Sequence, residues 1–280
     1  MALGSESPDY TFDAFARHDF YRVVNEHLVD ATLQIRERLP QLPIHRALDL
    51  ACGTGAVTQL LVDRVRRFRP PVEVIAVDPS ESALEKARRL VGNAAAFVRG
   101  TAQAFSQVAS NLDVILFCNA IHLLPDTDKD SVVGQARRAL NPDGVLGFNT
   151  SFYEGCYTPG TERFYKLWML RALQLLRQET GMKPDRSKVE AMRWLTPDEY
   201  RDLVERHGFV IEDMHAEQAL MTCRSWQDIS HYSEFASGAL PGVPVDVAIR
   251  VLQRAVKQAY DELGISEIPR NWLQVVARAV

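Results

Sequence analysis

Two acidic residues and a pair of glycines carry the strongest chemical signal in this sequence. Residues 47–55 read ALDLACGTG, in which an apolar run contains Asp49 and ends in a turn with Gly53 and Gly55. Glycine lacks a Cβ, so such a turn can adopt positive φ angles and let a ligand lie against the main chain. A carboxylate inside a buried strand needs a partner, and a cationic or N–H-rich ligand group would serve. The layout is typical of a loop that binds a nucleoside cofactor.

A second acid follows the next apolar run. Residues 74–78 read VIAVD, so Asp78 ends the expected second strand. Open α/β sheets bind ligands at the carboxyl ends of their strands. A carboxylate at this position can accept hydrogen bonds from both hydroxyls of a ribose. Ser80 is expected to cap the following helix, whose apolar stripe would face the sheet.

These residues resemble the first two motifs of the class I S-adenosylmethionine-dependent methyltransferases. The resemblance departs at Ala51, where the family usually has a further glycine. It implies that S-adenosyl-L-methionine is the cofactor and that the backbone of Gly53 and Gly55 faces its methionine and ribose. It also implies that Asp49 holds the methionine amino group, directly or through water, and that Asp78 binds the ribose hydroxyls.

The resemblance extends to the third and fourth expected strands and to the N-terminal segment. The family has an acid or amide beside the adenine where this chain has Thr101, so the Ala102 backbone is expected to make that contact. Asn119 follows the fourth strand, whose end lies beside the transferable methyl group. The segment before the first strand often closes over the cofactor, which makes Tyr21 a candidate. The expected cofactor-binding residues are Asp49, Ala51, Gly53, Gly55, Asp78, Pro79, Thr101, Ala102, Asn119 and Tyr21.

His122 is the candidate catalytic residue, because the resemblance places it near the methyl group. A histidine can act as a general base near neutral pH. Methyl transfer needs a base only when the acceptor must lose a proton. A histidine that packs and caps locally is the alternative, and the sequence does not distinguish the two.

Alternating apolar and amphipathic stretches indicate the elements that position these residues. Five strands separated by helical stretches predict an α/β fold with a doubly wound parallel sheet. The resemblance implies the full architecture, a Rossmann-like, seven-stranded and mostly parallel sheet with helical cap insertions. A sixth strand begins at Phe209, and residues 272–277 resemble the family's last strand, antiparallel to the fifth. The expected domains are an N-terminal helical cap (1–45), a cofactor-binding core (46–150), a helical lid insertion (151–195), a core continuation (196–222), a second helical cap (223–270) and a last core strand (271–280).

The two insertions are rich in aromatic and aliphatic residues. Residues 164–176 are apolar around most of a helical circumference, and their place between the fifth and sixth strands favours a lid over a substrate pocket. A membrane-surface element, a homodimer contact and plain core are the alternatives for this helix. Apolar insertions predict a hydrophobic acceptor of small or medium size. The candidates for lining its pocket, each equally compatible with packing, are Tyr153, Tyr157, Trp168, Trp194 and Tyr232.

Composition limits the function classes. The chain has 280 residues, is 46% hydrophobic and carries a net charge of -4, which argues against a nucleic-acid-binding surface. Its 4 cysteines show neither metal-ligand spacing nor a disulfide framework, so no metal is expected. The absence of a signal-like segment and of a long apolar run predicts a cytoplasmic protein without a membrane span. Residues 1–8 read as a polar leader.

The sequence therefore favours methyl transfer to a hydrophobic small molecule, by O- or C-methylation. Two alternatives stay open. The first is a protein that binds S-adenosylmethionine without catalysing transfer, or that uses it in a non-methylating reaction. The second is a nicotinamide-dependent oxidoreductase, which fits less well because Thr58 stands where the nicotinamide fingerprint has its third glycine.

Overall fold

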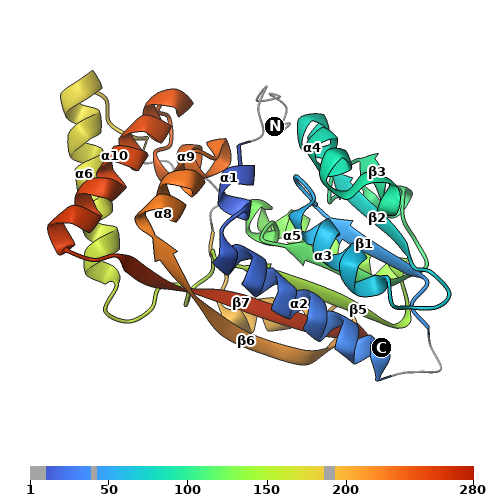
Figure 1. Ribbon diagram of the computed structural model, residues 1–280. Coiled ribbons are helices and arrows are strands. Elements are labelled where there is room, and N and C mark those ends of the chain that lie inside the picture. Colours follow the sequence, from blue (N-terminus) through green and yellow to red (C-terminus); the bar gives the residue numbers. More distant parts are fainter. Residues whose placement is uncertain (1–10, 39–42, 186–192) are drawn as a thin grey trace.

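A seven-stranded sheet with the order β3-β2-β1-β4-β5-β7-β6 forms the centre of the protein (Figure 1). The computed structural model describes residues 11–38, 43–185 and 193–280, and the expected leader at residues 1–8 lies outside them. The first five strands run parallel, and β7 runs antiparallel to both β5 and β6. This confirms the predicted Rossmann-like, mostly parallel sheet. The strands are β1 (Arg46–Leu50), β2 (Glu73–Asp78), β3 (Ala96–Arg99), β4 (Leu112–Cys118), β5 (Leu140–Thr150), β6 (Phe209–Thr222) and β7 (Glu267–Ala279).

Helices cover both faces of the sheet. They are α1 (Asp13–Ala16), α2 (Asp19–Glu37), α3 (Ala56–Val65), α4 (Glu81–Val91), α5 (Asp126–Ala139), α6 (Glu162–Thr180), α7 (Pro197–Glu205), α8 (Cys223–Ser230), α9 (Ser233–Ala239) and α10 (Val245–Leu263). The short 3₁₀ turns are η1 (Gly92–Ala94), η2 (Phe105–Gln107) and η3 (Ile121–Leu123).

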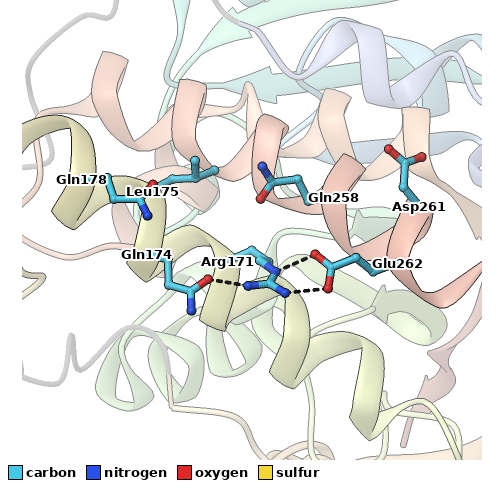
Figure 2. A pocket seen from close by; sticks show the side chains of 7 residues that line it. All are labelled: Arg171, Gln174, Leu175, Gln178, Gln258, Asp261 and Glu262. Atoms are coloured by element: carbon cyan, nitrogen blue, oxygen red, sulfur yellow. Dashed lines mark hydrogen bonds and ion pairs between the residues drawn. The ribbon is translucent and has the colours of Figure 1, made fainter.

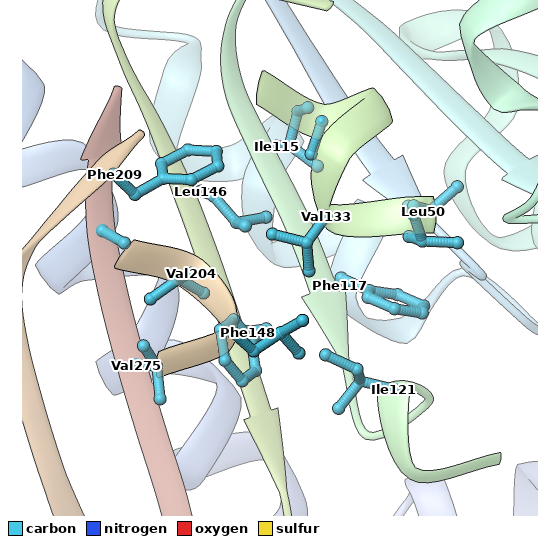
Figure 3. Close-up of a cluster of buried hydrophobic side chains, with 14 of the residues drawn as sticks. Leu50, Ile115, Phe117, Ile121, Val133, Leu146, Phe148, Val204, Phe209 and Val275 are labelled. Carbon is cyan, nitrogen blue, oxygen red and sulfur yellow. The ribbon is translucent and has the colours of Figure 1, made fainter. Parts of the chain in front are cut away.

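The central strand β4 shows why the chain builds a two-sided layer. All of its residues are buried, and their side chains alternate between two hydrophobic cores. Ile115 and Phe117 pack against α5 and α7 through residues such as Val133 and Val204 (Figure 3). Leu116 packs on the opposite face with residues of α2 and α3. A continuous apolar run is what a parallel strand covered on both faces requires.

A third hydrophobic core lies in the group formed by α6, α8, α9 and α10, at the end of the sheet where β7 begins (Figure 1). Trp168 of α6 is 5% exposed there and donates its Nε1–H to the Leu252 carbonyl at 3.1 Å. Residues 164–176 were expected to be apolar around most of the helix, but the helix is buried on one side only. On the other side, Leu170 and Leu173 are 49% and 40% exposed. Most of its apolar surface packs within this helical group.

The antiparallel hairpin of β6 and β7 joins the sheet to the helical group. Its pairing runs from Phe209 opposite Ala279 to Thr222 opposite Glu267, whereas β5 pairs only with residues 273–278 of β7. The expected boundary between the second cap and the last strand, at residues 270 and 271, is wrong. The strand begins at Glu267 because the two long strands continue to pair beyond the edge of β5.

Candidate functional site

The turn between β1 and α3 folds as a series of left-handed residues. Ala51, Gly53 and Gly55 have φ angles of 57°, 52° and 86°. A Cβ on Gly55 would lie 2.9 Å from the Cβ of Ala87 in α4, so this position needs glycine for packing as well as for backbone conformation. The Cys52 N–H donates to the Val77 carbonyl at 3.0 Å, which holds the turn against the end of β2. Ala51 adopts the same conformation without being glycine.

Asp78, the last residue of β2, binds the backbone of this turn. Its Oδ2 accepts the Gly53 N–H at 2.8 Å, and its Oδ1 accepts the Ser80 N–H at 2.9 Å. Burial raises the pKa of Asp78, and these two backbone donors act in the opposite direction. A carboxylate oxygen can accept more than one hydrogen bond. The side chain therefore shapes the loop and keeps acceptor capacity for hydroxyl donors of a ligand.

Asp49 is the more deeply buried acid, with 1% of its surface exposed. Its Oδ2 accepts the Thr58 hydroxyl at 2.6 Å. Burial raises the pKa of Asp49 to about 7, and the nearby charge of Asp78 acts in the same direction. Sequence reasoning missed this internal partner, because Thr58 was noted only as a missing glycine. A cationic ligand group beside Asp49 would favour its ionised form.

Asn119 begins a chain of amide hydrogen bonds at the end of β4. Its backbone has a φ of 49°, and its N–H donates to the Asn149 side chain at 2.9 Å. The Asn149 amide donates to Asn25 of α2 at 3.0 Å, and Asn25 donates to the Tyr21 carbonyl at 2.7 Å. Three asparagines are the sequence signal for this network: Asn119 and Asn149 at the ends of apolar strands, and Asn25 among the apolar residues of a helix.

Tyr21 is 5% exposed and lies beside the same edge of the sheet. Burial raises the pKa of its hydroxyl, and the Cys118 thiol and the Asp49 carboxyl act in the same direction. The ring of Phe12 packs against both Tyr21 and Tyr232, with centroid separations of 5.7 Å and 5.2 Å. The N-terminal helices and the second cap therefore meet over this edge.

Tyr232 is partly buried in the second cap and packs against Phe12. Burial raises the pKa of the Tyr232 hydroxyl, and Glu234 and Asp78 act in the same direction. Pro79 and Thr101 flank the same edge, since Asp78 and Arg99 are register partners in β2 and β3. Ala102 follows Thr101 and is partly buried, whereas Thr101 is exposed.

His122 lies in η3, directly after β4, and is 7% exposed. Its Nδ1 is 3.0 Å from the Thr150 hydroxyl, and its ring centroid is 4.5 Å from that of Phe152. Burial lowers the pKa of His122 to about 3, and the charges of Arg270 and Lys129 lower it further. The imidazole is therefore neutral near pH 7, and it is a weak proton acceptor in this environment.

The remaining aromatic candidates separate into two groups. Tyr153 is 1% exposed within the sheet core, and Trp168 lies in the helical core, so both fit the packing alternative. Tyr157 and Trp194 lie together, with ring centroids 5.4 Å apart, and Trp194 is 6.2 Å from Phe152. This second group is contiguous with His122 through the Phe152 ring.

A polar groove of about 350 Å³ lies between α6 and α10. Figure 2 shows Arg171 and Glu262 facing each other across it, with two N–O distances of 2.6 Å. Figure 1 places these helices at the far side of the molecule from α4 and β2. The groove is therefore separate from the Asp49 and Asp78 edge, and its charged walls do not suit an apolar acceptor.

Comparison with known proteins identifies the fold family. Residues 47–144 match a family model described as a methyltransferase domain, and this span contains the turn and both acids. The part of the chain that carries the turn and both acids is therefore similar to methyltransferase domains. An uncharacterised methyltransferase of Mycobacterium bovis is 32% identical over 102 residues, which are 36% of this chain and 38% of that protein. A malonyl-[acyl-carrier protein] O-methyltransferase of Methylovorus sp. is 31% identical over 153 residues, covering 49% and 50%.

Solved methyltransferases share the fold across most of the chain. A putative methyltransferase of Bacillus halodurans superimposes with a TM-score of 0.51 at 16% identity, covering 88% of this chain and 97% of that one. The CurJ carbon methyltransferase gives 0.53 at 16% identity, covering 98% and 59%. The curated sequence relatives are matched over half of their length or less, so the similarity in sequence is concentrated in the methyltransferase domain.

Two further observations concern metal sites and membrane-spanning helices. Among the residues that the structure describes, no group of His, Cys, Asp and Glu side chains is arranged to hold a metal ion. Within residues 11–38, 43–185 and 193–280, no helix has both the length and the apolar character needed to cross a membrane.

The low pKa of His122 predicts a loss of stability in acid. In the unfolded chain the pKa returns to its ordinary value of 6.5, so the unfolded state binds the proton first as the pH falls. Between pH 7.5 and pH 5 this difference should cost the fold about 2 kcal/mol. Urea unfolding at both pH values should show a smaller loss for His122→Gln than for the wild type. His231→Gln, at an exposed position, is the control. Equal losses in wild type and His122→Gln would contradict a buried neutral imidazole.

Proposed function

We propose that this protein transfers a methyl group from S-adenosyl-L-methionine to a small or medium-sized hydrophobic organic acceptor, by O- or C-methylation. The observation that carries the proposal is the placement of Asp49 and Asp78 around the left-handed turn of residues 51–55. Both acids lie in the span that matches the methyltransferase domain. An adenosyl sulfonium cofactor has the ribose hydroxyls and the amino group that two such carboxylates would bind.

The residues at this edge fit such a cofactor. Each oxygen of Asp78 accepts one backbone N–H and retains a lone pair for a ribose hydroxyl. Asp49 is held by the Thr58 hydroxyl, and a neighbouring ammonium group would offset the cost of its ionisation. The cofactor supplies a methyl group already activated by its sulfonium. The main task of the chain is then to orient the acceptor, which can contribute about 7–11 kcal/mol to lowering the barrier.

The aromatic group beside His122 supports an apolar acceptor. Phe152 contacts His122, and Tyr157 and Trp194 continue the aromatic wall away from the end of β4. The neutral state of His122 suits an acceptor that needs no proton removed, or one that is already deprotonated. One relative is named as an O-methyltransferase and one fold neighbour as a carbon methyltransferase, so both atom types remain in the proposal.

Two measurements test this function. In a thermal unfolding assay, S-adenosylhomocysteine at 100 times its Kd should stabilise the protein by about 2.7 kcal/mol, whereas NAD should have no effect. An extract incubated with the protein and isotope-labelled S-adenosylmethionine should yield a product heavier by one labelled methyl group, detected by mass spectrometry. Stabilisation by NAD alone would favour the oxidoreductase. Binding of S-adenosylhomocysteine without any labelled product across a panel of hydrophobic acceptors would favour a non-catalytic binding protein.

A further inference from the structure

Arg270 occupies an unusual position in β7. Its side chain is 3% exposed, and its guanidinium carbon lies 5.0–5.8 Å from the centroids of four aromatic rings. One Nη donates to the Tyr165 hydroxyl at 3.3 Å, and the other donates to the Ser151 carbonyl. The Nε–H is buried and has no hydrogen-bond partner. The rings are those of Phe152, Tyr157, Tyr165 and Trp226.

The other buried cationic side chains form ion pairs with carboxylates. In the part of the chain that the structure describes, the buried cationic side chains are Arg36, Lys129 and Arg270. Arg36 pairs with Asp113 at 3.0 Å, and Lys129 pairs with Asp126 at 2.9 Å. No carboxylate of the described residues pairs with Arg270. Burial of an unpaired charge is costly, and contacts with aromatic faces offset only part of that cost.

Arg270 lies next to the end of β4. The Ser151 carbonyl that it binds belongs to a residue whose hydroxyl is 3.4 Å from the Asn119 side chain. Phe152, beneath the guanidinium, is the same ring that contacts His122. The cation therefore borders the region in which the proposed function places the acceptor.

The aromatic rings around Arg270 reach the surface on one side. Tyr157 is 43% exposed, and its ring contacts that of Trp194, which is partly buried. Tyr157 therefore contacts the buried guanidinium and also reaches the surface. An acceptor entering here would meet aromatic walls first and a single positive charge at their base.

We propose that Arg270 binds a carboxylate on the acceptor, so that the substrates of this site are apolar molecules with one planar anionic group. This inference rests on the proposed function and specifies its substrate class. A guanidinium matches the geometry of a carboxylate, and the Nε–H is the donor that the protein leaves for it. The aromatic rings would hold the apolar body, and the bound anion would balance the buried charge.

The test compares a carboxylate with its neutral isostere. Calorimetry on protein saturated with S-adenosylhomocysteine would measure the affinities for 2-naphthoate and 2-naphthamide. The wild type should bind the carboxylate at least tenfold more tightly than the amide. Arg270→Met should lose at least tenfold in affinity for 2-naphthoate and keep its affinity for 2-naphthamide. Arg171→Met, which removes a partly buried arginine of α6 that pairs with Glu262, is the matched control and should behave as the wild type.

Equal affinities of the two probes for the wild type, or no binding of either, would overturn the proposal. The same holds if Arg270→Met retains the preference for 2-naphthoate. If Arg270→Met does not fold, Arg270→Lys replaces it, because it keeps the charge and loses the planar fork. That variant should keep a weaker preference for the carboxylate. Failure of the proposed function would appear separately, as wild-type protein that does not bind S-adenosylhomocysteine but still prefers 2-naphthoate.

Discussion

Replacing Asp78 with alanine will weaken the binding of S-adenosylhomocysteine at least tenfold and leave the protein folded. Hydrogen bonds to a charged acceptor contribute about 1.5–3 kcal/mol each, and about 1.4 kcal/mol corresponds to a tenfold change in Kd. The substitution removes the proposed acceptor for the ribose hydroxyls together with the bonds that hold the Gly53 and Ser80 N–H groups. Both the contact and the shape of the loop are lost.

Isothermal titration calorimetry measures the effect, and circular dichroism verifies the fold. Glu73→Ala is the matched control, because Glu73 begins the same strand that Asp78 ends. Its ion pair with Arg46 is exposed, so its loss should change neither affinity nor fold appreciably. Asp78→Asn should also bind weakly, since its amide would turn a donor toward one of the two N–H groups. Unchanged affinity in Asp78→Ala would remove Asp78 from the cofactor site.

Asp49→Asn is expected to stabilise the cofactor-free protein at pH 8 and to weaken cofactor binding. The folded state raises the pKa of Asp49 from 3.8 to about 7, so ionisation favours the unfolded chain between those two values. The wild type therefore loses stability as the pH rises toward 7, and the loss is constant above it. Full ionisation should cost about 4 kcal/mol, which an amide avoids.

Urea unfolding at pH 4.5 and pH 8 measures this difference. The advantage of Asp49→Asn should be larger at pH 8, and Asp63→Asn, at a position exposed on α3, should show no such change. Wild-type affinity for S-adenosylhomocysteine should increase as the pH passes 7, because the carboxylate then attracts the amino group of the ligand. The affinity of Asp49→Asn should be low and should lack that increase. Equal free energies of unfolding for the wild type and Asp49→Asn at pH 8 would show that the buried carboxylate of Asp49 does not destabilise the fold.

The sequence predicted the structure best where the pattern within a single segment was enough to indicate its fold and burial. The apolar run of β4 required cover on both faces, and the glycines required a tight turn, so the parallel core followed from local patterns. The start of β5 was less clear. Residues 141–144 read NPDG, a composition that favours a turn, but they continue the strand from Leu140 with a register irregularity beside β4.

Contacts between distant segments could not be predicted in this way. The bond between Arg270 and Ser151 joins residues 119 positions apart, and the aromatic rings around Arg270 come from three separate stretches of the chain. Arg270 lies near the start of a strand whose first residues were expected to be part of a cap. A lone arginine at such a position reads as a surface charge until tertiary packing shows that it is buried.

The pairing of β6 with β7 has an evolutionary consequence. Residues 223–266 leave the end of β6 and return to the start of β7, where Thr222 pairs with Glu267, so the hairpin itself closes the junction. Helices could be exchanged there as a cassette without disturbing the register of the strands that carry Asp49 and Asp78. Under the proposed function, grafting this cassette between related proteins would alter the walls of the proposed acceptor site and keep the strands that carry the two acids.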